Sequence, residues 1–337
     1  MISITGNMKH IQYILMMTVI VLLAACSQDV VDEQAQEPDA ALRLAGVTRA
    51  VTGDTEYSDI RVFLTNGTTV TEGLFKYEGE SSSWTTQLKL KSGARTYQLY
   101  GYMPDNAGST HSITDFDDNG AVLHIEQLPP LATQDFCVVT GVHEAENESD
   151  ETAAVRGAFS FNYNSQYENY INLFLDHLYS HIIFSMRVGD DYNAVRTIKI
   201  KSMKLQVADI SHYNVDVTLT KDVGISSVAH SSVAGTGTDE LTIRDEEITL
   251  TTSYKTVCSG YIIPATTTLF DKLSLVIEYD IYDKRGNKVA ERTATNALAT
   301  PLEELQRGEE RTLQINIDPS YLYDLSLNDP PIVVIRE

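Results

Sequence analysis

The sequence has few cysteines and few basic residues. Three cysteines in 337 residues are too few for a disulfide-stabilised scaffold or a four-cysteine zinc site. Lys and Arg together number 25 against 47 Asp and Glu, so the formal net charge is −22. Binding to nucleic acid, or to an anionic membrane surface through a basic patch, needs clustered Lys and Arg. The sequence therefore predicts no nucleic-acid partner and no electrostatic adhesion to a membrane.

Hydrophobic residues make up 42% of the chain, which is enough to build sizeable cores. Short runs rich in β-branched and aromatic residues recur between Gly, Asn, Asp and Ser, a pattern typical of strands in sandwiches or barrels. Helical patterns are limited to 169–179 and 301–306. We therefore predict an all-β fold. Its strands are expected at 60–64, 74–77, 84–90, 97–103, 121–125, 136–140, 155–163, 181–188, 196–207, 215–219, 247–252, 257–263, 273–282 and 310–317.

The length of the chain suggests two domains. The segment His143–Ala154 is acidic and has no large apolar residue, so we interpret it as a linker. It divides the folded chain into an N-terminal domain at 50–151 and a C-terminal domain at 152–319. The turn signal Thr65-Asn66-Gly67-Thr68 predicts a hairpin early in the first domain.

The N-terminus has the organisation of an export signal. The apolar run Tyr13–Ala25 is shorter than the roughly 20 residues that span a bilayer and has the length of a signal-peptide core. It ends in Leu23-Ala24-Ala25-Cys26, which resembles a bacterial lipobox. We predict a lipoprotein signal peptide at 1–25, lipidation of Cys26, and an acidic tether or leader at 26–49. The alternative is an ordinary secretory peptide with an incidental cysteine.

The C-terminus, residues 320–337, is unusually apolar for a chain end. Alternate positions carry large side chains at Tyr321, Tyr323, Leu325 and Leu327, and a continuous apolar run follows at Ile332, Val333, Val334 and Ile335. Such a segment needs to be covered. It can donate a strand to the groove of a neighbouring chain, or it can pair within its own domain. Both alternatives remain open from the sequence.

Other candidate sites are weaker. Asp115–Glu126 has calcium-loop spacing, but no helix flanks it, so we favour a β-turn. His177 and His181 have the spacing of ligands on one helix face without a third ligand, which favours packed or surface residues. Cys137 and Cys258 are expected to be buried free thiols, with a disulfide as the alternative. We predict no metal, no cofactor and no enzymatic activity, since nucleophile and phosphate-loop motifs are missing.

Several features occur in the order found in one known family. They are the lipobox at Cys26, the leader that ends in Arg49, the strand 60–63, the hairpin Tyr77…Trp84, and the segments 97–104, 135–139, 175–184 and 196–200. With these features the chain resembles the fimbrillins, or type V pilins, of Bacteroidetes-type bacteria. The resemblance covers essentially the whole chain, but as a loose pattern and not as sharp motifs.

The resemblance implies two transthyretin-like Greek-key β-sandwich domains with few short helices. It also implies export as an outer-membrane lipoprotein carrying palmitate on Cys26, and assembly at the cell surface by strand exchange. In the family a trypsin-like protease cuts after an Arg at the position of Arg49, which removes the first strand and exposes a groove; Arg43 competes for this role. Residues 320–337, read above from their apolar pattern, are the candidate donor for this exchange.

The function implied is that of a structural subunit of cell-surface fimbriae that supports adhesion. The alternative is a fimbrial tip or lipid-tethered adhesin of the same fold that binds a glycan or a protein. The expected partners are other fimbrial subunits, the outer membrane through the lipid on Cys26 before processing, and a ligand on host or bacterial surfaces.

Overall fold

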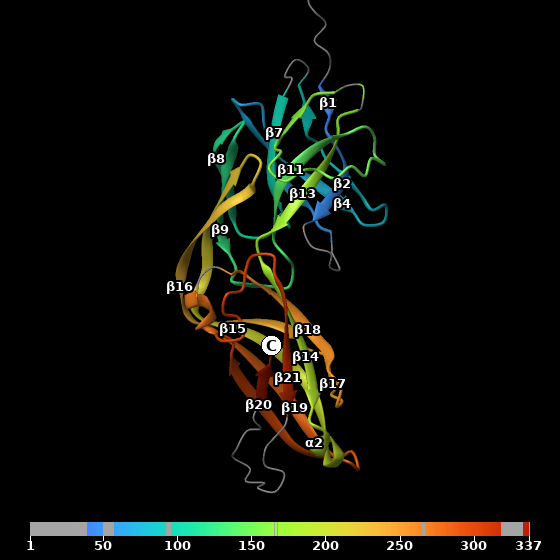
Figure 1. Cartoon of the computed structure of the whole chain (residues 1–337), viewed down its shortest axis with the longest axis vertical. Coiled ribbons are helices and arrows are strands. Elements are labelled where there is room, and N and C mark those ends of the chain that lie inside the picture. Colours follow the sequence, from blue (N-terminus) through green and yellow to red (C-terminus); the bar gives the residue numbers. More distant parts are fainter. Residues whose placement is uncertain are drawn as a thin grey trace, which may run out of the picture. The chain divides into compact units, whose positions relative to one another are not determined.

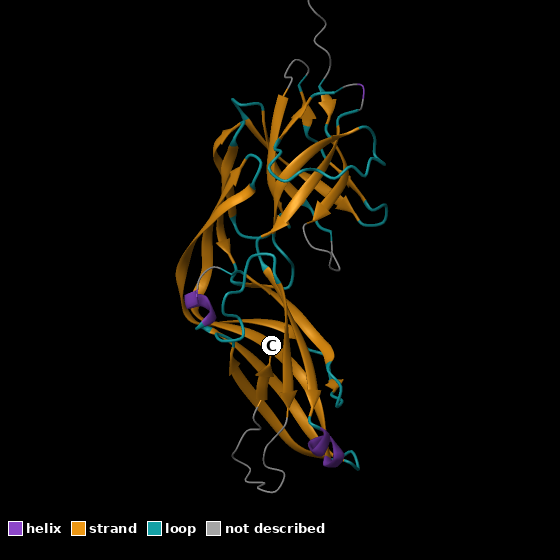
Figure 2. Ribbon diagram, viewed as in Figure 1, coloured by secondary structure: helices purple, strands orange, loops and turns teal. Residues whose placement is uncertain are grey.

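The protein is described by a computed structural model covering residues 39–49, 57–91, 96–164, 166, 168–264, 267–317 and 333–336. It is almost entirely β-structure, as predicted, with the short helices α2 (Asp190–Val195) and α3 (Thr267–Phe270) (Figure 2). Neither these helices nor any other in the described part of the chain is long and apolar enough to cross a membrane.

The largest sheet has eight strands, seven of them in one continuous order. That order is β2 (Arg43–Arg49), β13 (Tyr170–His177), β11 (Cys137–Ala145), β7 (Thr96–Met103), β3 (Ile60–Thr65), β4 (Val70–Glu78) and β5 (Ser83–Thr85) (Figure 1). The eighth strand, β12 (Ser160–Asn162), pairs with β7. The turn predicted at 65–68 joins β3 to β4, and this prediction is confirmed.

The second sheet has seven strands. Five of them follow the order β20 (Lys288–Ala297), β19 (Leu273–Asp283), β15 (Arg196–Thr220), β9 (Gly120–Leu128) and β8 (Thr110–Asp117), while β16 (Gly224–Arg244) and β17 (Ile248–Thr249) also pair with β15. The third sheet has the order β10 (Leu131–Ala132), β18 (Lys255–Ile262), β14 (Ser180–Val188), β21 (Glu310–Ile317) and β22 (Val333–Arg336). A small fourth sheet joins β1 (Ala40–Ala41) to β6 (Lys89–Leu90).

Strand β3 of the eight-stranded sheet is buried on both faces and contributes to two cores. Along β3, Val62 and Leu64 face one core, core A, and Phe63 faces the other, core B, as the two-residue period of a strand requires. Core B receives apolar side chains from all three large sheets, for example Phe63, Leu123 on β9 and Phe184 on β14. Core A is formed by Leu42, Leu44, Ile60, Val62, Leu64, Phe75, Leu88, Leu90, Tyr97, Leu99, Met103, Cys137, Val139, Val142, Phe161, Ile171, Leu173 and Leu175.

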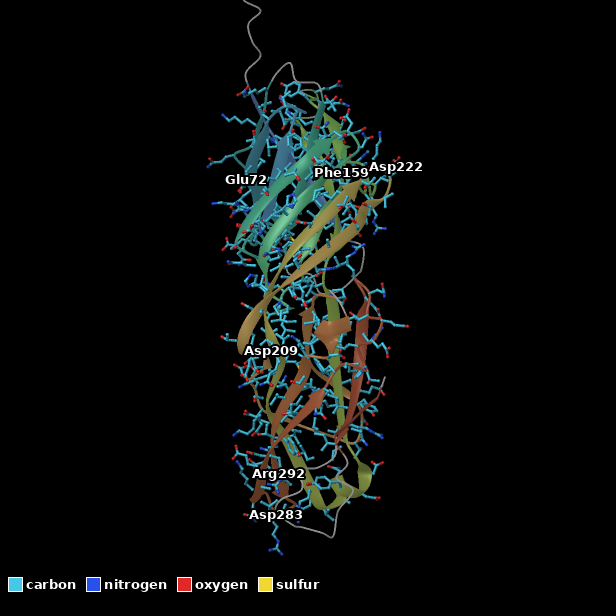
Figure 3. The ribbon with its side chains drawn as sticks, turned by 90° about the vertical axis from the view of Figure 1, so that its left-hand side faces the viewer. Glu72, Phe159, Asp209, Asp222, Asp283 and Arg292 are labelled. Carbon is cyan, nitrogen blue, oxygen red and sulfur yellow. The ribbon has the colours of Figure 1, made fainter. Side chains whose placement is uncertain are left out.

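Strand β15 connects strands from distant parts of the sequence. Its residues 196–207 pair with β19, and its residues 213–220 pair with β9. Asp209, labelled in Figure 3, lies between these two stretches with a positive φ of 57°, where the register with β16 also shifts. This β-bulge bends one continuous strand so that it serves both pairings.

The sheets do not separate at the predicted boundary between residues 151 and 152. Strands β12 and β13 lie beyond that boundary, yet they pair with β7 and β11 of the first half. The acidic segment turns back onto β13, because the side-chain amide of Asn172 donates hydrogen bonds of 2.8 Å to the carbonyl oxygens of Asp150 and Thr152. The segment is thus a connection within the first half of the fold and not an interdomain linker.

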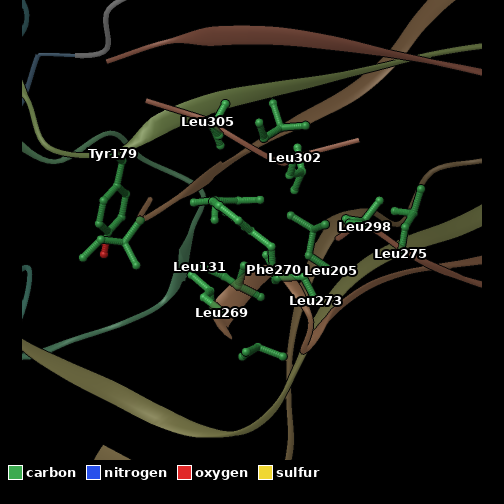
Figure 4. Close-up of a cluster of buried hydrophobic side chains, with 14 of the residues drawn as sticks. Leu131, Tyr179, Leu205, Leu269, Phe270, Leu273, Leu275, Leu298, Leu302 and Leu305 are labelled. Atoms are coloured by element: carbon green, nitrogen blue, oxygen red, sulfur yellow. The ribbon is translucent and has the colours of Figure 1, made fainter. Parts of the chain in front are cut away.

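The two segments with helical patterns are not helices. Residues 170–177 form β13, which places Ile171, Leu173 and Leu175 in core A at alternate positions, while Asn172 and Asp176 are buried polar residues between them. Residues 301–306 form turns that place Leu302 and Leu305 in core B, near Leu298 (Figure 4). In this cluster the hydroxyl of Tyr179 donates a 2.5 Å hydrogen bond to the carbonyl oxygen of Pro129.

Candidate functional site

The N-terminal leader ends in a strand of the largest sheet. Residues 40–41 and 43–49, which the sequence assigns to a tether, form β1 and β2. Strand β2 pairs in parallel with β13 at one edge of the sheet, and it also lies against β5. The tether prediction missed these strands because Arg43–Arg49 contains only two large apolar residues, too few for a strand pattern.

The side chains of this leader strand are part of core A. Leu42 and Leu44 are 1% and 6% exposed, and Val47 packs against the same core. The backbone amide of Leu42 donates a 3.0 Å hydrogen bond to the carbonyl oxygen of Leu88. At Gly46 a Cβ would lie only 2.9 Å from Oδ1 of Asn172, so the strand approaches β13 closely there. Removal of β1 and β2 would therefore uncover apolar surface of core A.

The two candidate processing residues occupy different places on β2. Arg43 begins the strand, donates a 3.0 Å hydrogen bond to the hydroxyl of Tyr170 and forms a 2.9 Å ion pair with Glu168. Arg49 ends the strand, with its backbone in register with Leu175. The following residues, from Ala50 to Glu56, lie outside the described chain. The side chain of Arg43 is thus engaged by the fold, and Arg49 marks the end of the strand.

The end of the chain also forms an edge strand. Val333, Val334 and Ile335 belong to β22, which pairs antiparallel with β21 of the same chain, from Ile317 opposite Val333 to Gln314 opposite Arg336. The pairing is the within-chain alternative that the sequence left open. The other predicted tail residues, Tyr321, Tyr323, Leu325, Leu327 and Ile332, lie outside the described residues, as do the signal peptide and Cys26.

The calcium-like segment Asp115–Glu126 is a hairpin turn, the form that the sequence favours. Strand β8 ends at Asp117 and β9 begins at Gly120, and the amide of Asn119 donates a 2.6 Å hydrogen bond to the Asp117 carboxylate. This backbone hydrogen bond lowers the pKa of Asp117. Glu126 pairs with Thr110 at the opposite end of the hairpin, so its carboxylate does not converge with that of Asp117.

His177 and His181 do not share a helix face. His177 ends β13, whereas His181 lies in β14, where it forms a 3.1 Å ion pair with Glu310. No disulfide joins Cys137 to Cys258, in agreement with the interpretation that the sequence favours. Burial raises the pKa of Cys258 to about 12, and its Sγ lies 3.5 Å from the Met203 sulfur.

The sequence analysis missed a cluster of Asp135, Cys137 and His177. Their potential ligand atoms all lie within 4.8 Å of one another. Nδ1 of His177 contacts Oδ2 of Asp135, and the Cys137 thiol donates a 3.2 Å hydrogen bond to the same oxygen. Asp135 and Cys137 thus both face Nδ1 of His177, whereas in a catalytic triad the carboxylate and the nucleophile contact different ring nitrogens of the histidine. The direct register of Cys137 with His177 could not be foreseen while 169–179 was read as a helix.

Comparisons with known proteins give structural neighbours only. No protein-family model and no curated protein matches the chain. A protein of Bacteroides uniformis to which cell adhesion is attributed matches with a TM-score of 0.44 and 11% identity over 88% of this chain and 96% of that one. A fimbrial protein of Bacteroides vulgatus matches with a TM-score of 0.42 and 12% identity over 89% and 98%.

The fimbrial anchor protein Mfa2 of Porphyromonas gingivalis is a third solved structure with similarity to the chain. Its TM-score is 0.29 at 10% identity, over 87% of this chain and 96% of that one. The names of these three proteins refer to fimbriae or to cell adhesion.

Proposed function

We propose that the protein is a structural subunit of cell-surface fimbriae that assembles by strand exchange and supports adhesion. In this proposal the chain is exported as an outer-membrane lipoprotein through Cys26, and cleavage after Arg49 releases the leader. The groove left by β1 and β2 then accepts the C-terminal segment of a neighbouring subunit.

The observation that carries the proposal is the position of β2. It is an edge strand that precedes the rest of its sheet in sequence, ends at Arg49, and buries Leu44 in core A, next to the equally buried Leu42 that directly precedes the strand. Loss of an edge strand leaves a row of unpaired backbone groups beside β13, and loss of two leucines leaves apolar pockets. A donated strand satisfies both requirements, since its backbone pairs with the sheet and its alternate side chains fill the pockets.

The C-terminal segment has the chemistry of such a donor. Alternate large side chains at Tyr321, Tyr323, Leu325 and Leu327 suit pockets on one face of a strand. In the single chain, β22 covers the edge of β21. Polymerisation therefore requires an exchange in which tail residues leave or extend beyond this pairing and enter the groove of the next subunit.

A peptide experiment tests the exchange directly. The protein beginning at Ala50, which is the product of cleavage after Arg49, should bind a synthetic peptide of residues 320–337, measured by fluorescence anisotropy. The full-length chain should not bind it, because β2 occupies the groove. A peptide with Leu325→Asp and Val333→Asp is the matched control and should bind much more weakly, since each carboxylate would be buried without a partner. Equal binding of both peptides, or no binding of either, contradicts strand exchange.

A processing experiment tests the role of Arg49. Arg49→Ala should leave lipidated, full-length protein that does not polymerise, while Arg43→Ala should be processed normally. N-terminal sequencing of the cell-surface protein provides the measurement, with Ala50 expected for the wild-type chain. Normal fimbriae from the Arg43→Ala, Arg49→Ala double variant contradict the proposal.

A lipid-tethered adhesin or tip subunit is the second candidate. It is favoured by one observation, the pairing of β22 with β21 within the same chain, because an adhesin needs no free donor tail. In that case the surface protein begins at lipidated Cys26, or it is processed but its tail never leaves β21. Retention of Cys26 on wild-type cells, with binding to a host or bacterial surface, assigns the chain to this role.

A further inference from the structure

Three side chains with metal-ligating atoms meet where β11 begins and β13 ends. Cys137 is the first residue of β11, His177 is the last residue of β13, and the antiparallel register places them directly opposite each other. Cross-strand neighbours in such a pair share one face of the sheet. Asp135 precedes Cys137 by two residues and joins the same cluster.

The distances among the three ligand atoms are close to those of a metal site. The Cys137 sulfur lies 3.6 Å from Nδ1 of His177 and 3.2 Å from Oδ2 of Asp135. Around a tetrahedral zinc ion, with bonds of about 2.0–2.3 Å, two ligand atoms are roughly 3.4–3.6 Å apart. Only the contact between His177 and Asp135 has to open for an ion to enter between all three.

The cluster is buried and incompletely satisfied. The side chains of Asp135 and His177 are 7% and 12% exposed, and Cys137 is fully buried. Within the described structure, Oδ1 of Asp135 and Nε2 of His177 are buried without a hydrogen-bond partner. An unpaired buried carboxylate oxygen is costly, and a bound ion is one of the features that accounts for such an atom.

We propose that Asp135, Cys137 and His177 form a binding site for a divalent ion of the zinc class. Mixed sulfur, nitrogen and oxygen donors suit zinc, whereas calcium and magnesium prefer oxygen alone. A carboxylate and a thiolate together neutralise the two positive charges, and the imidazole binds as a neutral ligand. Binding breaks the S–H bond of Cys137 and forms a metal–sulfur bond, so one thiol proton leaves for solvent. Because Nδ1 is the ligand atom, the ring proton of the bound imidazole lies on Nε2.

A cavity adjoins the site at His177. It has a volume of about 380 Å³ and is lined by His177, Arg156, Asp176, Arg307 and Gly308 among others. The Asp176 carboxylate partly neutralises the guanidinium groups there, since Arg156 pairs with it at 2.5 Å. In the proposal a water molecule takes the fourth coordination position.

Zinc and cobalt binding to the full-length protein test the proposal. Zn²⁺ should raise the melting temperature of the wild-type chain, and Co²⁺ should give a thiolate-to-cobalt charge-transfer band in the near ultraviolet. Cys137→Ser and His177→Asn should lose both effects. The matched controls are Cys258→Ser, which removes the other described thiol, and His181→Asn, which removes the neighbouring imidazole; both should keep them. Cys26 is present in every variant, so any metal binding by its thiol contributes equally to all of the measurements.

Proton release provides a measurement that needs no variant. Calorimetric zinc titrations of the wild-type chain in two buffers of different ionisation enthalpy should show about one proton released per ion. No zinc-induced stabilisation of the wild type overturns the proposal, as does a cobalt band that persists in a folded Cys137→Ser variant. If that variant does not fold, zinc binding by the wild type without proton release overturns it.

Discussion

Strands β2 and β22, near the two ends of the described chain, close sheet edges in different ways. Strand β2 pairs in parallel with β13 and places Leu44 inside core A, where the preceding residue Leu42 is also buried. Strand β22 pairs antiparallel with β21 over four residues at the edge of the five-stranded sheet. The first strand is therefore a component of a core, while the second is described only as an addition to an edge.

The difference has a consequence for assembly. A strand whose side chains complete a core leaves an apolar groove when it is removed, whereas a short edge strand leaves mainly unpaired backbone groups. In the proposed strand exchange the groove lies at the N-terminal end, and the donor strand comes from the C-terminal end of a neighbouring chain. Predictions that compare the two ends therefore test the proposed strand exchange.

The largest effect is expected from removing the leader. The protein beginning at Ala50 loses the burial of Leu42 and Leu44, worth about 1.5–3 kcal/mol for each side chain, together with the backbone pairing to β13. Its free energy of unfolding should therefore fall by several kcal/mol in urea titrations. Deleting residues 320–337 should cost clearly less. A greater loss from the tail deletion would mean that β22 is a permanent part of its own sheet.

A point substitution sharpens the same comparison inside the leader. Leu44→Ala should lower the free energy of unfolding by roughly 2–5 kcal/mol, the range for a leucine truncated in a packed core. Thr48→Ala, on the same strand but half-exposed, is the matched control and should change it by less than about 0.5 kcal/mol. Equal effects of the two substitutions would show that β2 is not packed as described.

A third comparison is between side-chain contacts on the two strands that pair with β2 and β22, which are β13 and β21. On β13 the Asp176 carboxylate is 5% exposed and accepts hydrogen bonds from Arg156 and Thr140. Arg156→Ala leaves this buried charge without its cation, which costs roughly 3–5 kcal/mol for a buried pair. The lower end is expected, because Arg156 is itself half-exposed.

The side-chain contact between His181 on β14 and Glu310 on β21 should matter less. His181 and Glu310 are 3.1 Å apart and partly exposed, so His181→Asn should change the free energy of unfolding by at most about 1 kcal/mol. Urea titrations of the two variants at pH 7 make the comparison. A larger loss from His181→Asn than from Arg156→Ala would contradict the ranking.

Sequence patterns predicted most of the strands that carry alternating or continuous apolar residues, with β13 misread as a helix, and they missed strands that lack such residues. Strands β16 and β20 are rich in Ser, Thr and Ala and mostly exposed, so only their pairing with β15 and β19 defines them. Strand β2 has only two large apolar residues, Leu44 and Val47, among its seven positions. Its pairing with β13 is therefore what defines it as a strand. The all-β class was thus readable from local patterns, whereas edge strands depend on their neighbours.

The site was less predictable than the fold for the same reason. Arg49 and the tail could be picked out by their place in the sequence. The pairing of β2 with β13, and that of β22 with β21, are contacts between segments that are distant in the sequence. The cluster of Asp135, Cys137 and His177 joins residues about 40 positions apart through a register that no local pattern encodes. Such contacts follow from sheet order, which the sequence did not reveal.

The smallest effect on stability is expected from acidification, which should act mainly on strands β8, β9 and β16. Burial lowers the pKa of His111 on β8 and of His230 on β16 from the ordinary 6.5. The folded chain therefore binds these protons less readily than the unfolded chain, and protonation favours unfolding. The stabilisation is complete above about pH 6.5 and declines as the pH falls toward the folded-state pKa values. Hydrogen exchange at pH 7.5 and 5.5, corrected for intrinsic rates, should show greater loss of protection in β8, β9 and β16 than in β21. The double variant His111→Gln, His230→Gln should reduce that difference, and an unchanged difference would assign the pH dependence to other groups.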